Sequence, residues 1–325
     1  MRSEARYLPE LFLDRLHKMI PLRKWDQTAN TFTQPKPTTF RVNMLRVSRE
    51  SAWEKLNRQG FRLRAVPWYS DAFVLCEGRL KELEKTEVYL NGEIYVQSLS
   101  SMIPPIVLDP KPGERVLDLT AAPGSKTTQM ACLMKGEGEI VAVENDQIRY
   151  AKLKSNVELQ EAKNVKLLLG YGESIGRKYP ESFDRVLLDA PCSAEGRFDT
   201  REPSSYRYWT LRKVQEIAKT QRKLLFSALS ALKPGGVLIY STCTFAPEEN
   251  EGVVNEALEK FGSSIELEPI RLSLSNQMYG LTAWGGKSFK PSLGKTVRIL
   301  PTSDMEGFFI ALILKPFNQS LRRKL

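Results

Sequence analysis

From about residue 97 onward, short apolar stretches alternate with longer amphipathic ones, and this alternation leaves few folds open. The apolar stretches predict strands at 115–120, 140–145, 164–169, 183–189 and 236–242. Helical stretches separate them, among them 146–160, 210–232 and 247–261. Strands that alternate with helices form a parallel sheet with helices on both faces. We therefore predict an α/β fold, to which segments 295–300 and 307–315 add a terminal hairpin.

The first hundred residues follow a different pattern. Leu8–Ile20 has apolar residues at helical spacing, which predicts an amphipathic docking helix with a structural role for His17. After a linker, the sequence predicts a strand at 38–45, a helix from Ser48 to Gln59 that Gly60 ends, and strand-like sequence over 61–76. We predict a helix plus a small β-α-β subdomain at residues 1–95, an α/β core at 96–318 and a basic tail at 319–325.

Composition excludes several kinds of chemistry. The four cysteines form no CxxC pair and there is one histidine, so a zinc ribbon, a multi-histidine metal site and a Ser-His-Asp triad are not expected. We predict no metal. Residues 1–20 carry many charges and lack an apolar signal core, and no run approaches the ~18 apolar residues of a membrane helix. We expect a cytoplasmic protein without membrane association, and a monomer.

The charge is unevenly distributed. The chain has 48 Lys and Arg against 38 Asp and Glu, a net charge of +10. Residues 1–100 carry +5 and residues 271–325 carry +7, whereas 101–270 carry −2. Basic flanks around a near-neutral centre favour a polyanionic partner, with the solvated surface of a basic protein as the alternative.

The first predicted core strand continues into residues 118–126, Asp-Leu-Thr-Ala-Ala-Pro-Gly-Ser-Lys. Ligands of open α/β sheets bind beyond the carboxyl ends of the strands. Small residues let this loop approach a ligand before a helix that we expect to begin at about Thr127. A P-loop is excluded because Ser125 stands where the glycine before the lysine is required, and the Rossmann GxGxxG is missing too. A structural turn is the alternative.

Glu144 ends the second core strand, where an acid can accept hydrogen bonds from both hydroxyls of a ribose. A solvated side chain is the alternative. Together with the loop, this acid favours a cofactor that carries a nucleoside and needs no phosphate site. S-adenosylmethionine is such a molecule.

Two more strand ends each deliver a cysteine. The fourth core strand runs into Asp189-Ala-Pro-Cys192, and the fifth ends just before Cys243. If these strands are neighbours, both thiols lie at one edge of a cleft beside Asp189. The other two cysteines, Cys76 and Cys132, are predicted to be buried hydrophobic residues.

Several motifs then occur in the order of a known family. LDLTAAPGSKTTQ, LLDAPCSAEG and YSTCTFAPEENE resemble the Nop/Sun (NSUN) family of RNA 5-methylcytosine methyltransferases, TTFRVN resembles its amino-terminal motif, and EGFFIA its closing strand. The stretch from DAPCSAEG to IAKTQRKLL is most similar to the bacterial RsmF (YebU) type, which acts on small-subunit ribosomal RNA. We expect the extra carboxyl-terminal RNA-binding domain of that type to be missing. The resemblance implies a Rossmann-like methyltransferase sheet with an amino-terminal α+β RNA-binding subdomain.

The resemblance implies roles for the site residues. Cys243 is the nucleophile that adds to cytosine C6, and Cys192 assists release of the adduct. Asp189 binds the cytosine edge, and Lys126 is a further catalytic residue. Cys192 is the rival nucleophile, because cytosine-5 DNA methyltransferases use the cysteine of a Pro-Cys motif. The base that removes the C5 proton is left open among water, a thiolate and a carboxylate.

The resemblance also implies which residues contact S-adenosylmethionine, whereas the candidates for RNA contact follow from the basic and aromatic residues themselves. The cofactor residues are Thr120, Ala121, Ala122, Pro123, Gly124, Ser125, Lys126, Glu144, Arg149, Tyr171 and Asp189. Tyr171 stands where the family usually has an aspartate, and stacking on the adenine is its alternative role. Residues 197–209 mix arginines with aromatics, as a site for unpaired RNA does, although the aromatics could instead pack under the loop. The RNA candidates are Arg41, Arg197, Arg201, Arg207, Tyr208, Trp209, Lys287 and Lys290, with Lys295 and Arg298 beside the last two.

We therefore predict an S-adenosylmethionine-dependent RNA cytosine-5 methyltransferase with ribosomal RNA as its substrate. Transfer RNA is an alternative substrate. A small-molecule methyltransferase and a non-catalytic RNA-binding or assembly factor are alternative functions.

Overall fold

The computed structural model describes residues 8–317, so residues 1–7 and the predicted basic tail lie outside the described part. The amino-terminal part begins with α1 (Glu10–Met19) and α2 (Leu22–Asn30). A four-stranded antiparallel sheet follows, in the order β2-β3-β1-β4. Its strands are β1 (Thr39–Val42), β2 (Arg62–Val66), β3 (Tyr69–Glu77) and β4 (Ile94–Val96), with α3 (Arg49–Arg58), α4 (Leu80–Leu83) and α5 (Glu87–Leu90).

Local sequence signals determine where α3 begins and ends. The Ser48 hydroxyl accepts a hydrogen bond from the backbone N–H of Ser51 (3.2 Å) and caps α3. Gly60 follows the helix with a φ of +86°, a conformation that glycine adopts without strain. The predicted helix from Ser48 to Gln59, which Gly60 ends, is confirmed.

The second sheet is mixed and has nine strands. Five parallel strands lie in the order β7-β6-β5-β8-β9: β5 (Arg115–Asp118), β6 (Glu139–Glu144), β7 (Val165–Leu169), β8 (Phe183–Asp189) and β9 (Leu232–Thr242). Beyond β9 lie four antiparallel strands: β15 (Phe308–Leu314), which pairs with β9, β14 (Val297–Ile299), β11 (Gln277–Tyr279) and β10 (Glu266–Glu268). The predicted terminal hairpin is confirmed as β14 and β15.

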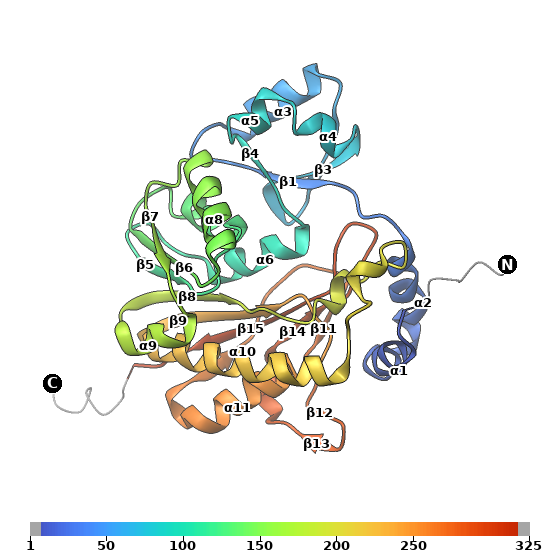
Figure 1. Ribbon diagram of the computed structural model, residues 1–325, viewed down its shortest axis with the longest axis vertical. Coiled ribbons are helices and arrows are strands. Elements are labelled where there is room, and N and C mark those ends of the chain that lie inside the picture. Colours follow the sequence, from blue (N-terminus) through green and yellow to red (C-terminus); the bar gives the residue numbers. More distant parts are fainter. Residues whose placement is uncertain (1–7, 318–325) are drawn as a thin grey trace.

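Helices cover both faces of this sheet, as Figure 1 shows. They are α6 (Leu99–Leu108), α7 (Ser125–Leu133), α8 (Gln147–Leu159), α9 (Ile175–Lys178), α10 (Leu211–Ala231) and α11 (Glu251–Phe261). Successive strand residues point to opposite faces. Val116 and Leu187 pack with α6, α7 and α8, whereas Leu117 and Val186 pack with α10 and α11. The predicted α/β fold is confirmed.

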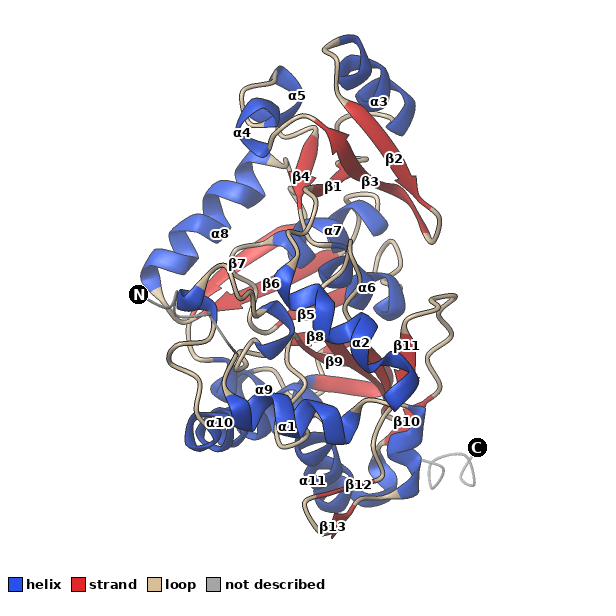
Figure 2. Cartoon of the chain, turned by 90° about the vertical axis from the view of Figure 1, so that its right-hand side faces the viewer, coloured by secondary structure: helices blue, strands red, loops and turns tan. Residues whose placement is uncertain are grey.

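Some boundaries differ from the prediction. β9 begins at Leu232 instead of residue 236. α11 begins at Glu251 instead of residue 247, because Asn250 turns back to accept a hydrogen bond from the Thr242 hydroxyl (2.6 Å). A small hairpin of β12 (Ala283–Trp284) and β13 (Lys287–Ser288) lies at the end of the molecule opposite the four-stranded sheet (Figures 1 and 2).

Helix α1 docks where the sequence predicts an amphipathic helix. Phe12 and Leu16 are buried against Phe198 and Phe245, which belong to loops after β8 and β9. Helix α1 therefore supports the loops at the carboxyl ends of the central strands. Among residues 8–317, no helix has the length and apolar character of a membrane span.

Candidate active site

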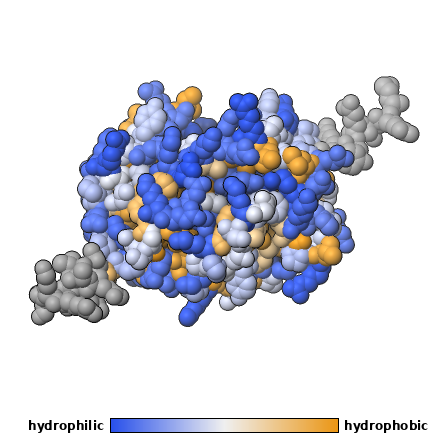
Figure 3. Space-filling view, turned by 90° about the horizontal axis from the view of Figure 1, so that it is seen from below, coloured by the Kyte–Doolittle hydropathy of each residue, from blue (hydrophilic) through white to orange (hydrophobic). Residues whose placement is uncertain are grey.

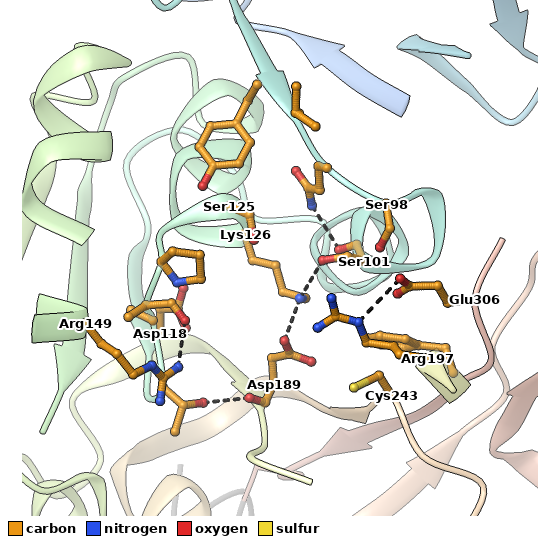
Figure 4. Close-up of a pocket in the computed structure, with 18 residues that line it drawn as sticks. Ser98, Ser101, Asp118, Ser125, Lys126, Arg149, Asp189, Arg197, Cys243 and Glu306 are labelled. Atoms are coloured by element: carbon orange, nitrogen blue, oxygen red, sulfur yellow. Dashed lines mark hydrogen bonds and ion pairs between the residues drawn. The ribbon is translucent and has the colours of Figure 1, made fainter. Parts of the chain in front are cut away.

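A cavity of about 400 Å³ lies at the carboxyl ends of β5, β8 and β9, between these strands and the β4–α6 connection. Figure 4 shows its side chains. Arg149 and Asp118 lie at one end, Cys243, Arg197 and Glu306 lie at the other, and the Lys126–Asp189 pair lies between them. The order of the parallel strands changes direction at β5, which has β6 on one side and β8 on the other. The cavity lies at this switch point, where α/β folds bind ligands.

The loop after β5 forms one end of the cavity. Asp118 is buried, and burial raises its pKa to about 7 even though its carboxylate accepts a hydrogen bond from the Thr127 hydroxyl (2.7 Å). Gly124 has a φ of +104° and faces α8, where a Cβ would lie 3.0 Å from the Leu153 side chain. The glycine therefore turns the chain into α7, which begins at Ser125, and Gly124 itself does not line the cavity.

A lysine–aspartate pair spans the middle of the cavity. The Lys126 ammonium donates to Asp189 (2.5 Å) and to the Ser101 hydroxyl (2.7 Å). The second Asp189 oxygen accepts from the Ser241 hydroxyl (2.9 Å). These bonds fix the carboxylate of Asp189 at the end of β8, with its charge balanced by Lys126.

The two strand-end cysteines meet, as predicted. The Cys192 and Cys243 sulfurs are 3.2 Å apart, and the backbone N–H of Cys243 donates to the Cys192 sulfur (3.3 Å). Both are free thiols, and Cys243 lines the cavity whereas Cys192 lies behind it. The hydrogen bond with Cys243, together with burial, raises the pKa of Cys192. The pair therefore offers one thiol that faces the cavity and one that holds its proton.

Two buried glutamates, which the sequence analysis missed, support the cysteine loops. One Glu249 oxygen accepts from the Ser193 N–H (2.9 Å) and the Gln221 amide (2.8 Å), and burial raises the pKa of Glu249 to about 8. Glu195 accepts from the Trp209 indole (2.8 Å) and from a backbone N–H beyond Cys243 (3.0 Å). Both glutamates lie inside the cysteine-bearing motifs, and this position is the sequence signal that could have identified them.

Arg197 and Glu306 were separate in the prediction and are together here. Arg197 lines the cavity, and its Nε lies 3.4 Å from a Glu306 oxygen. The Glu306 carboxylate, with the two nearby sulfurs, raises the pKa of Arg197, whereas burial acts in the opposite direction. Glu306 was not a sequence candidate because its motif indicated only the closing strand.

Comparison with known proteins decides the family. The model described as 16S rRNA methyltransferase RsmB/F matches residues 105–314, more than half of the chain. The model for the N-terminal domain of 16S rRNA methyltransferase RsmF matches residues 8–99. The chain belongs to the RsmB/F family. The resemblance to the RsmF type of the Nop/Sun enzymes is confirmed.

Individual RsmB/F relatives match over most of the chain. Ribosomal RNA small subunit methyltransferase F of Vibrio campbellii is 37% identical over 313 residues, which cover 95% of this chain and 63% of the relative. The protein of that name from Serratia proteamaculans is 36% identical, with the same coverage. The chain therefore spans somewhat less than two thirds of the length of the curated relatives it matches.

Solved structures share the fold of this chain. A methyltransferase homologue from Pyrococcus horikoshii has a TM-score of 0.82 at 35% identity, covering 95% of this chain and 96% of that one. NSun6 from the same organism has a TM-score of 0.79 at 23% identity, covering 95% and 99%, and shows the same fold. The Rossmann-like methyltransferase fold is confirmed.

The RsmB/F family consists of S-adenosylmethionine-dependent methyltransferases, and the cavity fits this cofactor. Asp118 and Asp189 line it, and their side-chain oxygens can accept hydrogen bonds from the charged amino group of the cofactor. The Arg149 guanidinium reaches the Ala122 carbonyl (2.9 Å) at the same end, beside the amino-terminus of α7, where a carboxylate is favoured. The residues present therefore suit both the amino group and the carboxylate of the cofactor.

Three predicted cofactor residues do not line the cavity: Gly124, as described above, Glu144 and Tyr171. Glu144 is 4% exposed, and one of its oxygens accepts from the N–H groups of Asn145 and Asp146 (2.9 and 3.0 Å) while the other faces Arg149 (3.5 Å). Tyr171 is 68% exposed. Their cofactor contacts stay predictions. The remaining candidates of the loop, Thr120, Ala121, Ala122, Pro123, Ser125 and Lys126, line the cavity with Arg149 and Asp189.

Three RNA candidates are buried or anchored: Arg41 and Arg298 have almost no exposed surface for a direct RNA contact, whereas Trp209 is half-buried and its RNA contact stays a prediction. Arg41 is fully buried and donates to Gln97 (2.9 Å) and the Thr128 hydroxyl (2.7 Å). Arg298 is 2% exposed and pairs with a buried glutamate. Trp209 is bound through its indole to Glu195 and packs beside α1. Phe198 and Tyr206 are also buried there, so these aromatics pack under the loop.

The other RNA candidates lie on the surface. Arg207 lies over the exposed ring of Tyr208 at 4.5 Å, and the Lys213 ammonium lies 5.3 Å from the same ring. Arg201 is paired with Asp199. Of the predicted basic group, Lys287 lies in β13, and the Lys290 and Lys295 ammonium groups donate to the backbone carbonyls of Leu258 and Leu267 (2.8 and 2.7 Å). None of the three lines the cavity. Figure 3 shows the end of the molecule that carries β13: it is mainly hydrophilic, with hydrophobic residues in small separate groups.

The two remaining cysteines, Cys76 and Cys132, do not line the cavity. Cys132 is half-buried and donates to Asn43 (3.2 Å), whereas Cys76 is exposed on β3, so its predicted burial is wrong. Cys76 comes directly after the buried residues 72–75 of β3, and the last two residues of this strand are exposed. Residues 8–317 contain no group of three His, Cys, Asp or Glu side chains placed to hold a metal ion.

Proposed function

We propose that this chain transfers the methyl group of S-adenosylmethionine to C5 of a cytosine in small-subunit ribosomal RNA. The observation that carries the proposal is the pair of free thiols 3.2 Å apart, one facing a cavity that also holds the Lys126–Asp189 pair. A methyltransferase that acts on an oxygen or an exocyclic nitrogen has no need of two thiols at the reacting position.

The chemistry explains why a thiol is needed. Cytosine C5 is a weak nucleophile, and a thiolate that adds to C6 converts the ring into an enamine, whose C5 is nucleophilic. Bound S-adenosylmethionine supplies the electrophilic methyl group. Loss of the C5 proton and expulsion of the sulfur then restore the aromatic ring.

Position within the cavity favours Cys243 as the nucleophile. Cys243 lines the cavity, whereas Cys192 lies behind it with a raised pKa, so Cys192 is suited to hold and return a proton during release. Asp189, fixed by Lys126 and Ser241, is suited to accept a hydrogen bond from the amino group of the cytosine. The target base must leave its stack to reach the sulfur.

Ribosomal RNA is favoured as the substrate by the curated relatives, which are named small-subunit ribosomal RNA methyltransferases. The exposed Arg207–Tyr208–Lys213 group offers cations and an aromatic ring for RNA near the loop that carries Arg197. Transfer RNA stays the alternative substrate.

The test is methyl transfer in vitro. The protein is incubated with labelled S-adenosylmethionine and either small-subunit ribosomal RNA or transfer RNA from undermethylated cells, and 5-methylcytosine is mapped. We expect label in ribosomal RNA, its loss in Cys243→Ala, and full activity in the matched control Cys76→Ala, whose thiol is exposed on β3. Label only in transfer RNA would change the substrate. No label in any RNA would favour a non-catalytic binding factor.

A further inference from the structure

Arg197 and Glu306 form a charge pair at the Cys243 end of the cavity, and the proposed chemistry does not yet use either. Figure 4 shows the Arg197 guanidinium directed into the cavity above Cys243, with Glu306 on its far side. The Arg197 side chain is 62% exposed, so it is open to an incoming ligand, whereas the Glu306 side chain is 21% exposed. The opposite end, beside Arg149 and Asp118, is the proposed cofactor end.

Backbone contacts hold this pair beside the nucleophile. The Gly196 N–H donates to the Cys243 carbonyl (2.9 Å), and the Gly307 N–H donates to the Gly196 carbonyl (3.1 Å). A Cβ on Gly196 would lie 2.2 Å from the Gly307 carbonyl oxygen, so only glycine permits this approach. Arg197 follows one glycine and Glu306 precedes the other. Their positions relative to Cys243 are therefore fixed by main chain rather than by flexible side chains.

Residues on both sides of Arg197 in the sequence, Glu195 and Phe198, are also anchored. Phe198 is 4% exposed and packs on Phe12, with ring centroids 4.9 Å apart. Glu195 is 1% exposed and holds both Trp209 and the backbone after Cys243. A guanidinium held in this way is pre-organised to stabilise charge that develops at the reacting ring.

The reaction creates such charge. When the Cys243 thiolate adds, the S–C6 bond forms and the π electrons of the C5–C6 bond move to C5. The negative charge is then shared with N3 and with the 2-oxo oxygen. Asp189 is proposed to lie at the amino edge of the base, so it cannot stabilise this charge at the 2-oxo edge. Arg197 is the cation at the Cys243 end of the cavity whose side chain is largely open.

We propose that Arg197 is a catalytic residue whose guanidinium donates to the 2-oxo group of the target pyrimidine, with Glu306 as its positioning residue. This inference rests on the proposed function. It assigns the Cys243 end of the cavity to a base with a carbonyl beside N3, and it separates Arg197 from the surface arginines of the same loop.

The test measures kcat and KM separately with a ribosomal RNA fragment. We expect Arg197→Ala to lower kcat by about 100-fold or more while KM changes little, because the interaction is made mainly in the transition state. Arg197→Lys should recover part of the loss, and Glu306→Gln should lower kcat less than Arg197→Ala does. Affinity for S-adenosylmethionine, measured by calorimetry, should not change in Arg197→Ala.

Lys233→Ala is the matched control. Lys233 pairs with Asp184 (2.7 Å) at the opposite ends of the same two strands, β8 and β9, so this variant loses an ion pair without touching the cavity. Its kcat should equal that of the wild type. A kcat within about twofold of wild type in Arg197→Ala would overturn the inference and leave the proposed function standing.

A second result would also overturn the inference. If Arg197 bound a backbone phosphate, Arg197→Ala would raise KM at nearly constant kcat and reduce the salt slope of RNA affinity by about one. A wild-type protein that methylates no RNA would instead overturn the proposed function, and this inference with it.

Discussion

Replacing Arg298 by methionine should destabilise the protein without a direct effect on RNA binding. The Arg298 and Glu251 side chains are 3% and 0% exposed, and Nε donates to a Glu251 oxygen at 2.7 Å. A second guanidinium nitrogen bonds the other carboxylate oxygen, and the third bonds the Phe245 carbonyl (2.8 Å). Without Arg298, the Leu281 N–H (2.9 Å) is the one hydrogen-bond partner that residues 8–317 leave to the buried carboxylate.

The expected cost follows from that burial. Removing one partner of a buried ion pair costs about 3–5 kcal/mol, because the other charge stays uncompensated. For 325 residues, an unfolding entropy of about 2.1 cal/mol/K per residue converts this cost into a fall in Tm of about 4–7 °C. Scanning calorimetry measures the shift.

Two companion variants make the result specific. Arg222→Met breaks an ion pair with Glu256 whose side chains are 37% and 45% exposed, so its cost should stay below about 1 kcal/mol. Adding Glu251→Gln to Arg298→Met removes the uncompensated charge and should restore part of the stability. An Arg298→Met protein with an unchanged Tm and weakened RNA binding would refute the reasoning, because Arg298 would then face RNA instead of Glu251.

Two further predictions concern the supports of the cysteine loops. Gly196→Ala places a Cβ 2.2 Å from the Gly307 carbonyl oxygen, so the two backbones must separate. We expect the free energy of unfolding in urea to fall by about 1–3 kcal/mol and methyl transfer to fall more strongly. If both values were unchanged, the close approach of the two glycines would be contradicted. Burial raises the pKa of Glu249 to about 8, against about 4.3 in the unfolded chain, so the folded state retains this proton. The stability that the proton contributes is therefore complete below about pH 4 and is lost as the pH rises towards 8. Glu249→Gln cannot ionise, so its Tm relative to wild type should increase between pH 5 and 8, and a difference independent of pH would refute the assignment.

The sequence predicts the fold and the centre of the site because both depend on local patterns and on strand ends. Once the strands at 183–189 and 236–242 are neighbours, Cys192 and Cys243 must lie at one edge of the sheet, and the sulfurs are 3.2 Å apart. Asp189 and Lys126 follow from the same rule. No knowledge of side-chain packing is needed to bring these four residues together.

The charged flanks are harder to interpret because an arginine gives no local sign of its partner. Arg41 and Arg298 have the same composition signal as Arg207, yet both are buried in contacts with residues far away in the sequence. Trp209 is likewise held by Glu195, and this contact depends on how the loop folds back. Net charge therefore predicts a polyanionic partner but does not select the residues that touch it.

The most direct test of the central claim is to trap the protein–RNA adduct. Substrate RNA that carries 5-fluorocytosine cannot lose a C5 proton, so after methyl transfer the sulfur stays bonded to C6 and the complex survives denaturing electrophoresis. We predict that wild type and Cys192→Ala form this complex in the presence of S-adenosylmethionine, that Cys243→Ala does not, and that peptide mapping finds the RNA on Cys243. A complex that persists in Cys243→Ala and disappears in Cys192→Ala would contradict the account and make Cys192 the nucleophile.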